Sequence, residues 1–250
     1  MSATRDRAVT GFVADTISFS NVDGPGNRFV VFLQGCNFDC VACHNPQTIP
    51  GHRPLDGFDP HHLSVADLLE RIRPAAPFIR GITASGGEAT QQPAFLRELF
   101  TAVKADPELA HLTCFVDSNG ATDGTVWSDL APVLDGAMID LKCFDPAIHR
   151  EMTGQPNNEV LASIEQLHGL GLLYEVRLLI VAGVNDDPGL IGRTAEWLAG
   201  VDPAMRIKLI GFRAHGVRPH DPPLVEPTHD GLLEIADHLR QVSDFEVCVV

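Results

Sequence analysis

The sequence predicts an α/β fold, a partial (β/α) barrel of about six parallel strands, on two observations. Short apolar runs typical of buried strands alternate with amphipathic segments of helical period, and this order of elements gives a parallel sheet covered by helices. The strand-like runs are almost continuously apolar, as expected of strands buried on both faces. No linker interrupts the 250 residues, so we expect residues 1–250 to form a single domain.

The predicted elements follow one another in a regular order. The strands are Arg28 to Gln34, Gly81 to Ser85, Leu112 to Asp117, Gly136 to Leu141, Tyr174 to Val181 and Arg206 to Phe212. The helices are Val65 to Ile72, capped by Ser64, then Gln92 to Lys104, Val160 to Leu170, Gly189 to Leu198 and Asp230 to Val242. In barrels of this kind the chemistry gathers at the carboxyl ends of the strands.

The loop after the first predicted strand carries three of the six cysteines. Cys36, Cys40 and Cys43 have the spacing C-x3-C-x2-C. A cluster that only transfers electrons normally takes four cysteine ligands, so three ligands leave one iron open to bind another molecule. Zinc, with His44 as fourth ligand, is the alternative, but structural zinc usually draws its ligands as two separated pairs, and Cys43 and His44 are adjacent.

Composition narrows the class of protein. The net charge of −15 and the scattered basic residues exclude a general nucleic-acid binder, and one tyrosine with two tryptophans disfavours a stacking platform. Six cysteines in 250 residues do not suggest a secreted disulfide framework, and Met1 to Arg7 is polar. No apolar run is long enough to cross a membrane. We therefore expect a cytoplasmic protein in which Cys114, Cys143 and Cys248 are single core thiols.

Polar residues follow the other predicted strands at the same edge of the sheet. They are Ser85-Gly86-Gly87-Glu88, Asp117-Ser118-Asn119-Gly120, Asp140 with Lys142, and Arg177 within the fifth strand. Paired glycines let the backbone approach a ligand closely, and Glu88 could receive an ammonium group. Asp140 and Lys142 are two residues apart on a strand and should face the same side, where an ordinary ion pair is the alternative to a ligand site.

These motifs resemble a known family. The cysteine loop followed by His44-Asn45-Pro46, the Ser-Gly-Gly-Glu strand end and the turn Asp23-Gly24-Pro25-Gly26 are similar to those of radical S-adenosylmethionine enzymes of the glycyl-radical-enzyme activase group, which includes the pyruvate formate-lyase activating enzymes. Within the group, the chain looks most like the YjjW-type activases. The segments most similar to those of the YjjW-type activases are Phe32 to Phe38, Ala76 to Thr83, Asp117 to Gly120, Asp135 to Lys142 and Ala214 to Val217.

The resemblance implies roles for the strand-end residues. Cys36, Cys40 and Cys43 would hold one 4Fe-4S cluster, whose open iron binds S-adenosylmethionine. Ser85, Gly86, Gly87 and Glu88 would meet the amino group of that ligand, and Asp117, Lys142 and Arg177 its ribose and carboxylate. Asp117, Ser118, Met138 and Asp140 match positions that bind a monovalent cation in the pyruvate formate-lyase activases. Asp23, Gly24, Pro25 and Gly26 would lie against the partner protein.

The chain also departs from the family pattern. Gln47 to Val65 lacks the cysteine-rich insert usual in YjjW-type chains, so we expect a single cluster. Ala42 replaces the aromatic residue that often precedes the third cysteine, which leaves adenine stacking to His44 or Phe38. Arg213 stands where the family has a histidine, and His215 could take over that role.

The activity implied is radical chemistry on a protein partner. Flavodoxin or ferredoxin would reduce the cluster, S-adenosylmethionine would be cleaved to a 5′-deoxyadenosyl radical, and this radical would remove a hydrogen from a glycine of a glycyl radical enzyme. The activase itself would be a monomer with no nucleic-acid or membrane partner. Two alternatives stay open: a radical enzyme acting directly on a small molecule or peptide, and an iron–sulfur electron carrier.

Overall fold

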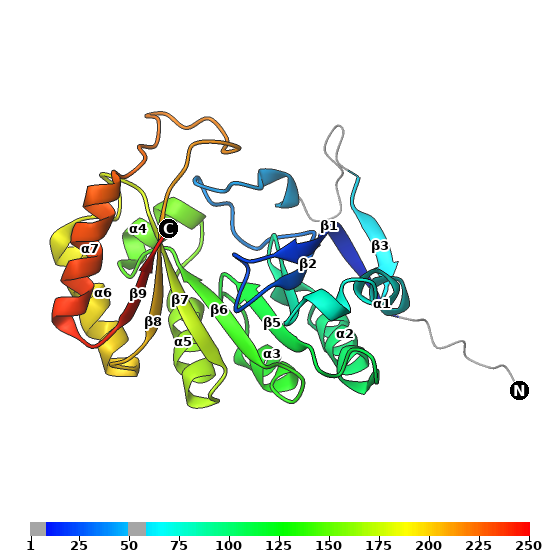
Figure 1. Ribbon diagram of the computed structural model, residues 1–250. Helices are drawn as coiled ribbons and strands as arrows, with labels where there is room; N and C mark the ends of the chain where they lie inside the picture. Colours follow the sequence, from blue (N-terminus) through cyan, green and yellow to red (C-terminus); the bar gives the residue numbers. More distant parts are fainter. Residues whose placement is uncertain (1–8, 50–58) are drawn as a thin grey trace, which may run out of the picture.

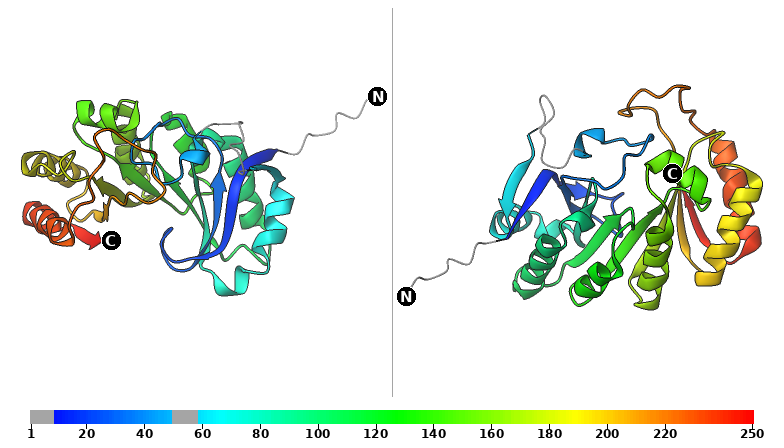
Figure 2. Two further views of the ribbon diagram at one scale, coloured as in Figure 1. Left: turned by 90° about the horizontal axis from the view of Figure 1, so that it is seen from above. Right: turned by 180° about the vertical axis from the view of Figure 1, so that it is seen from behind.

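The computed structural model describes residues 9–49 and 59–250 and contains one nine-stranded sheet. The strands lie in the order β3-β1-β2-β4-β5-β6-β7-β8-β9. β2 and β4 to β9 run parallel, while β1 pairs antiparallel with both β2 and β3. Figure 1 shows the sheet curving as an open barrel, with the long helices on its outer face, and Figure 2 shows the same arrangement from above and behind.

The bounds of the elements are as follows. The strands are β1 Thr10–Ser20, β2 Arg28–Leu33, β3 His61–Ser64, β4 Gly81–Gly86, β5 Thr113–Ser118, β6 Gly136–Leu141, β7 Leu173–Ile180, β8 Arg206–Gly211 and β9 Glu246–Val249. The α-helices are α1 Val65–Ile72, α2 Pro93–Ala105, α3 Gly124–Leu130, α4 Pro146–Thr153, α5 Asn158–Gly169, α6 Pro188–Val201 and α7 His229–Val242. Short 3₁₀ helices are η1 Pro46–Thr48, η2 Ala76–Phe78 and η3 Ala89–Gln91.

The α/β fold class and the open barrel are confirmed. Each of the six predicted strands corresponds to one of the parallel strands β2 and β4 to β8, and each of the five predicted helices is present. The helix at Val65–Ile72 starts where expected, because Ser64 and Asp67 form a reciprocal capping box. The elements that the sequence did not predict are short or exposed: β1, β3, β9, α3 and α4.

The main core lies between the sheet and the helices on its outer face. Trp127 of α3, Phe100 of α2 and Ile82 of β4 are among its fully buried side chains. A smaller cluster includes Ala42, Met152 and Phe212, and it packs the cysteine loop against α4 and the end of β8. Across the described residues, every helix is too short or too polar to cross a membrane.

Candidate active site

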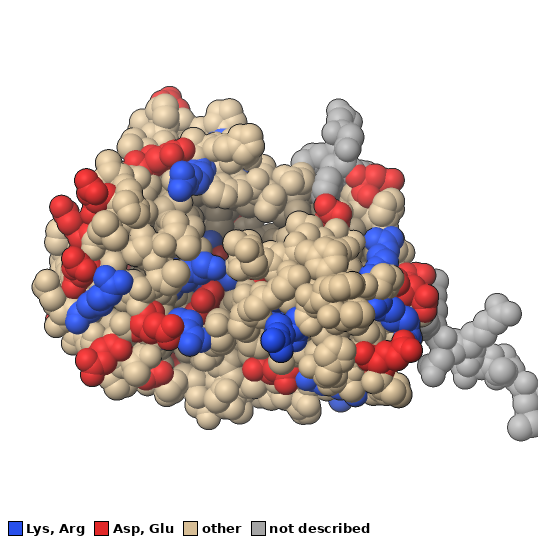
Figure 3. Space-filling model, viewed as in Figure 1, with Lys and Arg blue, Asp and Glu red and all other residues tan. Residues whose placement is uncertain are grey.

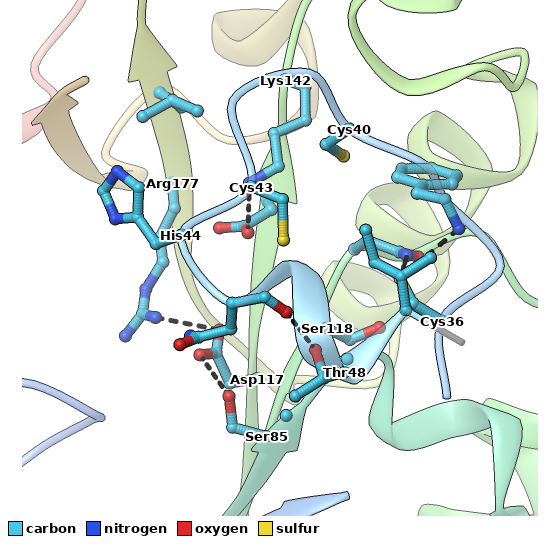
Figure 4. Close-up of a pocket in the computed structure, with 18 of the residues that line it drawn as sticks. Cys36, Cys40, Cys43, His44, Thr48, Ser85, Asp117, Ser118, Lys142 and Arg177 are labelled. Atoms are coloured by element: carbon cyan, nitrogen blue, oxygen red, sulfur yellow. Dashed lines mark hydrogen bonds and ion pairs between the residues drawn. The ribbon is translucent and has the colours of Figure 1, made fainter. Parts of the chain in front are cut away.

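A cavity of about 300 Å³ lies where the carboxyl ends of the parallel strands meet the cysteine loop. Its volume is at the lower end of the range for small-molecule sites. Most of the predicted site residues line it: Asp23, Cys36, Cys40, Cys43, His44, Ser85, Gly86, Gly87, Asp117, Ser118, Asp140, Lys142 and Arg177. Figure 4 shows the three cysteines of the loop together with Asp117, Lys142 and Arg177 from the strands.

Hydrogen bonds hold the cysteine loop from two sides. Asp39 N–H donates to Thr153 O and Val41 N–H donates to Met152 O, both at 2.9 Å, so the last turn of α4 supports the middle of the loop. On the other side, the Arg218 guanidinium donates to the Asp39 carboxylate at 2.5 Å and to Cys40 O at 3.1 Å. The loop is therefore fixed by residues far away in the sequence.

All three loop cysteines are free and half-buried. Burial raises the pKa of Cys36 to about 12 and that of Cys40 to about 11. The Asn119 amide donates to Cys36 Sγ at 3.8 Å and therefore supports negative charge on that sulfur. Because iron and zinc bind the thiolate, a metal group must displace protons from these thiols.

The donor set suits a group larger than one metal ion. The ring Nε2 of His44 lies 2.8 Å from Arg213 O, and since a carbonyl oxygen only accepts, this nitrogen carries the proton and leaves only Nδ1 for a metal. Within the described ranges, no three His, Cys, Asp or Glu side chains are grouped closely enough to hold a single ion. Three thiols around one open cavity fit an iron–sulfur cluster with a free position.

The two glycines after β4 approach another backbone more closely than a side chain would allow. A Cβ on Gly86, whose φ is +123°, would lie 2.2 Å from Leu33 N and O. A Cβ on Gly87 would lie 2.3 Å from Gly35 O. Both glycines line the cavity, but their conformation is required by packing against the end of β2 and the start of the cysteine loop.

Glu88, expected to meet the ligand's amino group, is buried and is absent from the cavity wall. Its carboxylate is fully buried and accepts from Thr90 N, Thr90 Oγ1, Ser118 Oγ and Asn119 N at 2.6–2.9 Å. Burial raises the pKa of Glu88, and these four bonds oppose that rise. Since protein donors reach both oxygens, Glu88 joins the end of β4 to the end of β5.

The charged residues of the wall form two pairs. Arg177 Nη1 lies 2.9 Å from Asp117 Oδ1, and Lys142 Nζ lies 2.7 Å from Asp140 Oδ2. Burial raises the pKa of Asp117, with Arg177 opposing. Burial works against the charge of Lys142, but Asp140, Cys40 and Asp117 outweigh it and raise its pKa. Two cations and two carboxylates on one wall suit a ligand that carries charges of both signs.

The four residues expected to bind a cation do not present four free ligands. Asp117 and Asp140 are already neutralised by Arg177 and Lys142. Ser118 Oγ donates to Glu88, and the sulfur of Met138, which is fully buried, lies 2.9 Å from Arg177 Nη2. The structure thus supplies basic side chains where a cation was expected.

The structure also places the residues that could replace the family's aromatic and histidine positions. His215 is exposed on the loop between β8 and α7 and does not line the cavity. His44 instead contacts this loop through Arg213 O, and its ring centroid lies 6.2 Å from that of Phe212. Phe38 lines the cavity, but its ring is buried and packs edge-on against His149. His44 is therefore the more accessible of the two candidates for stacking.

Several lining residues escaped sequence reasoning. They are Phe32, Asn45, Thr48, Ile49, Leu179 and Ile210. Phe32, Leu179 and Ile210 lie on β2, β7 and β8 and had been assigned only to buried strands. Knowing which face of each strand points inward would have identified them, and an almost continuously apolar strand conceals that information.

The turn before β2 also reaches the cavity. Asp23 lines it, and Gly24 and Gly26 have φ of +125° and +73°, which favours glycine. Thr83 Oγ1 donates to Asp23 O at 2.7 Å, and Arg28 Nη1 donates to Pro25 O at 3.2 Å. Burial lowers the pKa of Arg28 to about 10. Hydrogen bonds from Arg28 of β2 and Thr83 of β4 thus hold the turn in place.

The fold and this site define a class of protein. A family model described as the Radical SAM superfamily matches residues 30–191, which is more than half of the chain. The chain belongs to the radical S-adenosylmethionine superfamily, and its relatives place it among the glycyl-radical-enzyme activating enzymes.

Two relatives support the narrower assignment. A Haemophilus influenzae protein assigned as a glycyl-radical enzyme activating enzyme is 34% identical over 223 residues, which cover 81% of this chain and 82% of that protein. The pyruvate formate-lyase 1-activating enzyme of Escherichia coli K12 is 32% identical over 215 residues, covering 84% and 83%. The alternative of direct action on a small molecule is not favoured by these relatives.

Solved structures share the fold. A domain of a pyruvate-formate lyase-activating enzyme from Bacteroides vulgatus has a TM-score of 0.54 at 21% identity and covers 68% of this chain and 98% of that one. Streptococcus suis SuiB bound to S-adenosylmethionine has a TM-score of 0.64 at 13% identity, covering 87% and 48%. At these identities the likeness concerns the fold alone.

Proposed function

We propose that this protein uses a cysteine-held cluster and S-adenosylmethionine to install a radical on a glycine of a partner enzyme. The observation that carries the proposal is the cavity itself, in which three free thiols face two carboxylate–cation pairs. When bound, the cluster and S-adenosylmethionine together supply the 5′-deoxyadenosyl radical that abstracts the hydrogen atom.

The chain's own residues would bind and orient these groups. Cys36, Cys40 and Cys43 would hold the cluster as thiolates. Lys142 and Arg177 would donate to the ligand carboxylate. Each would give up part of its contact with its aspartate partner, Asp140 for Lys142 and Asp117 for Arg177. Ser85, which donates to Asp117 at 3.1 Å, and the backbone of Gly86 and Gly87 would position the amino group. This arrangement confines the reaction and excludes water from it.

Further features belong to the same proposal. A monovalent cation would bind beside Asp117 and Asp140 once the ligand carboxylate has drawn Arg177 and Lys142 away. Flavodoxin or ferredoxin would be the reductant, and the enzyme would act as a monomer in the reducing cytoplasm, where its six free cysteines stay reduced.

The test is electron paramagnetic resonance of the reduced protein with S-adenosylmethionine and pyruvate formate-lyase as the probe. We expect a doublet glycyl signal that changes when the glycine of the probe is deuterated, with deuterium passing into 5′-deoxyadenosine. Deuterium arriving from a small metabolite in the absence of a protein partner would favour direct action on a small molecule and contradict the proposal.

A further inference from the structure

The outer edge of β1 is unpaired over about half of the strand. β3 pairs only with the segment from Thr10 to Val13, whereas β2 follows the opposite edge of β1 as far as Ser20. Among residues 9–49 and 59–250, no other strand pairs with the outer edge of residues 14–20. An edge of this kind presents backbone donors and acceptors to which another chain can add.

This edge carries only part of the usual protection against strand addition. The segment 14–20 reads Ala-Asp-Thr-Ile-Ser-Phe-Ser and contains no lysine, no proline and a single charge. Two register irregularities bend the strand, but Ile17 is still 42% exposed and Phe19 52% exposed. Natural sheets commonly place several charges or proline on such edges to prevent pairing, so an unpaired edge with one charge and two exposed apolar side chains indicates a partner.

Two neighbouring side chains extend the apolar surface. Phe78 of η2 is 68% exposed, and its ring centroid lies 6.3 Å from that of Phe19. Val22, just after β1, is 62% exposed. We call Ile17, Phe19, Val22 and Phe78 the edge patch. Apolar side chains gathered in this way on a protein surface mark interaction sites.

The edge patch continues into the wall of the cavity. Val22 O accepts from Lys208 Nζ at 3.0 Å and from Arg177 Nη2 at 3.4 Å, and the next residue, Asp23, lines the cavity. Figure 3 shows that the surface directly to the right of the central hollow is largely uncharged. A segment lying along β1 would therefore lead directly to the place where the hydrogen atom is removed.

We propose that the edge of β1 and the edge patch dock an extended segment of the glycyl radical partner, which adds to the sheet as a further strand and brings its glycine to the cavity. This inference rests on the proposed function. Backbone hydrogen bonds to residues 14–20 would supply affinity, and Ile17, Phe19 and Phe78 would select apolar side chains in the added strand. The partner segment should accordingly be uncharged, with apolar residues at alternate positions.

The test places lysine on the edge, as natural edge strands do. The double variant Ile17→Lys/Phe19→Lys is compared with the wild type in glycyl radical formation on pyruvate formate-lyase at varied concentrations of that probe. We expect the KM for pyruvate formate-lyase to rise about tenfold or more, while kcat changes less than about twofold. Leu233→Lys, at a residue of α7 that is 41% exposed, is the matched control and should keep both constants.

A second readout does not depend on turnover. Amide hydrogen exchange over residues 14–20 of the holoprotein should slow when pyruvate formate-lyase is added, and the double variant should lose this protection. Phe78→Ser, which leaves the strand unchanged, should also raise KM. Iron content and thermal unfolding are measured on every variant, and Phe78→Ser keeps the test valid if the double variant folds poorly.

The contrary outcomes are distinct. An unchanged KM in both the double variant and Phe78→Ser overturns the docking proposal alone. A dimer of this chain in sedimentation that the double variant abolishes would assign the edge to a second copy and also overturn it. If wild-type protein forms no glycyl radical on the probe, the proposed function fails and the docking proposal falls with it.

Discussion

Cysteines of two kinds are distinguished by their surroundings. Cys36, Cys40 and Cys43 line one cavity, whereas Cys114, Cys143 and Cys248 lie apart from it. Replacing any of the first three by Ala should remove the iron and abolish 5′-deoxyadenosine formation, because two thiolates cannot hold the cluster. Iron analysis and chromatography of the nucleoside test this. Cys114 and Cys143 are buried as expected, but Cys248, expected in the core, is exposed on β9. Cys248→Ser is therefore the exposed control, and Cys114→Ser and Cys143→Ser should also retain iron; cleavage retained by Cys40→Ala would refute the ligand assignment.

Glu88 gives a prediction about stability. Glu88→Gln keeps the shape of the side chain but replaces one acceptor oxygen with an amide that faces a donor, either Asn119 N–H or Ser118 O–H. Leaving a buried donor unsatisfied should lower the free energy of unfolding by about 1–3 kcal/mol. Denaturant unfolding of Glu88→Gln and the wild type measures this difference in free energy. Glu70→Gln, at an exposed glutamate of α1, should change stability by less than about 0.5 kcal/mol, and equal effects would contradict the role given to Glu88.

Asp140 tests the proposed cation. If a monovalent ion binds beside Asp117 and Asp140, activity should fall when sodium and potassium are replaced by a bulky organic cation. Asp140→Asn removes one negative charge and should lower the cleavage rate about tenfold, equivalent to about 1.4 kcal/mol, while flattening the dependence on cation. Rates that are the same in all these salts would show that Lys142 and Arg177 neutralise the aspartates without an ion.

At the level of elements, sequence reasoning located strand ends but not the direction of each side chain. Asp117, Lys142 and Arg177 were expected together because parallel strands bring their carboxyl ends to one edge, and the structure places all three in the cavity. The burial of Glu88 was not expected, because a strand-end carboxylate that turns inward looks the same in sequence as one that faces a ligand. Thr90 and the end of β5 enclose the Glu88 carboxylate, and contacts of this kind between separate elements are not visible in the local sequence.

Helix α4 supports the cysteine loop and contains a buried histidine. His149 is fully buried, and its Nδ1 lies 2.9 Å from Gln155 O and therefore donates to it. Its Nε2 has no hydrogen-bond partner among the described residues, and its ring packs edge-on against Phe38 of the loop. Burial lowers the pKa of His149, and nearby Lys142 adds to this, while the bond to Gln155 opposes it.

The lowered pKa of His149 predicts a pH dependence of stability. Above the ordinary pKa of about 6.5 the histidine is neutral in both states and contributes nothing to the pH dependence. As pH falls, the unfolded chain takes up the proton first, so the free energy of unfolding should fall by up to about 1.4 kcal/mol per pH unit until the folded pKa is reached. His149→Gln should reduce this slope in denaturant unfolding between pH 7 and 5, and the exposed His111→Gln should retain the wild-type slope.

For the whole molecule, sequence periodicity predicted the parallel part of the sheet but not what precedes it. The strands β2 and β4 to β8 are apolar and buried, and so gave a strong signal. β1 contains Asp15, Thr16 and Ser18 and is exposed over its second half, so its pairing is set by β2 and not by its own composition. The edge that we propose as a docking site was therefore less visible in the sequence than the buried strands.

The turn before β2 joins opposite sides of the open barrel. Val22 O meets Arg177 of β7 and Lys208 of β8, while Thr83 of β4 holds Asp23 O. Residues separated by more than 150 positions thus meet at this turn, which borders the cavity where a partner glycine would enter. The Asp23 side chain accepts from Ser20 Oγ at the end of β1, which links the turn to the edge patch.

Asp23 therefore provides a prediction about the complex with the partner. Asp23→Ala keeps the backbone bond to Thr83 but removes the carboxylate that fixes Ser20 and faces the cavity. We expect iron content and S-adenosylmethionine binding to be retained and the glycyl radical yield on pyruvate formate-lyase to fall by on the order of tenfold, because a partner glycine that is poorly positioned reacts slowly. Spin quantitation of the glycyl doublet measures the yield, and calorimetry measures S-adenosylmethionine binding. Asp129→Ala, on the exposed face of α3, is the matched control. A loss of S-adenosylmethionine binding equal to the loss of radical would move Asp23 from the partner site to the ligand site, and an unchanged yield would remove it from both.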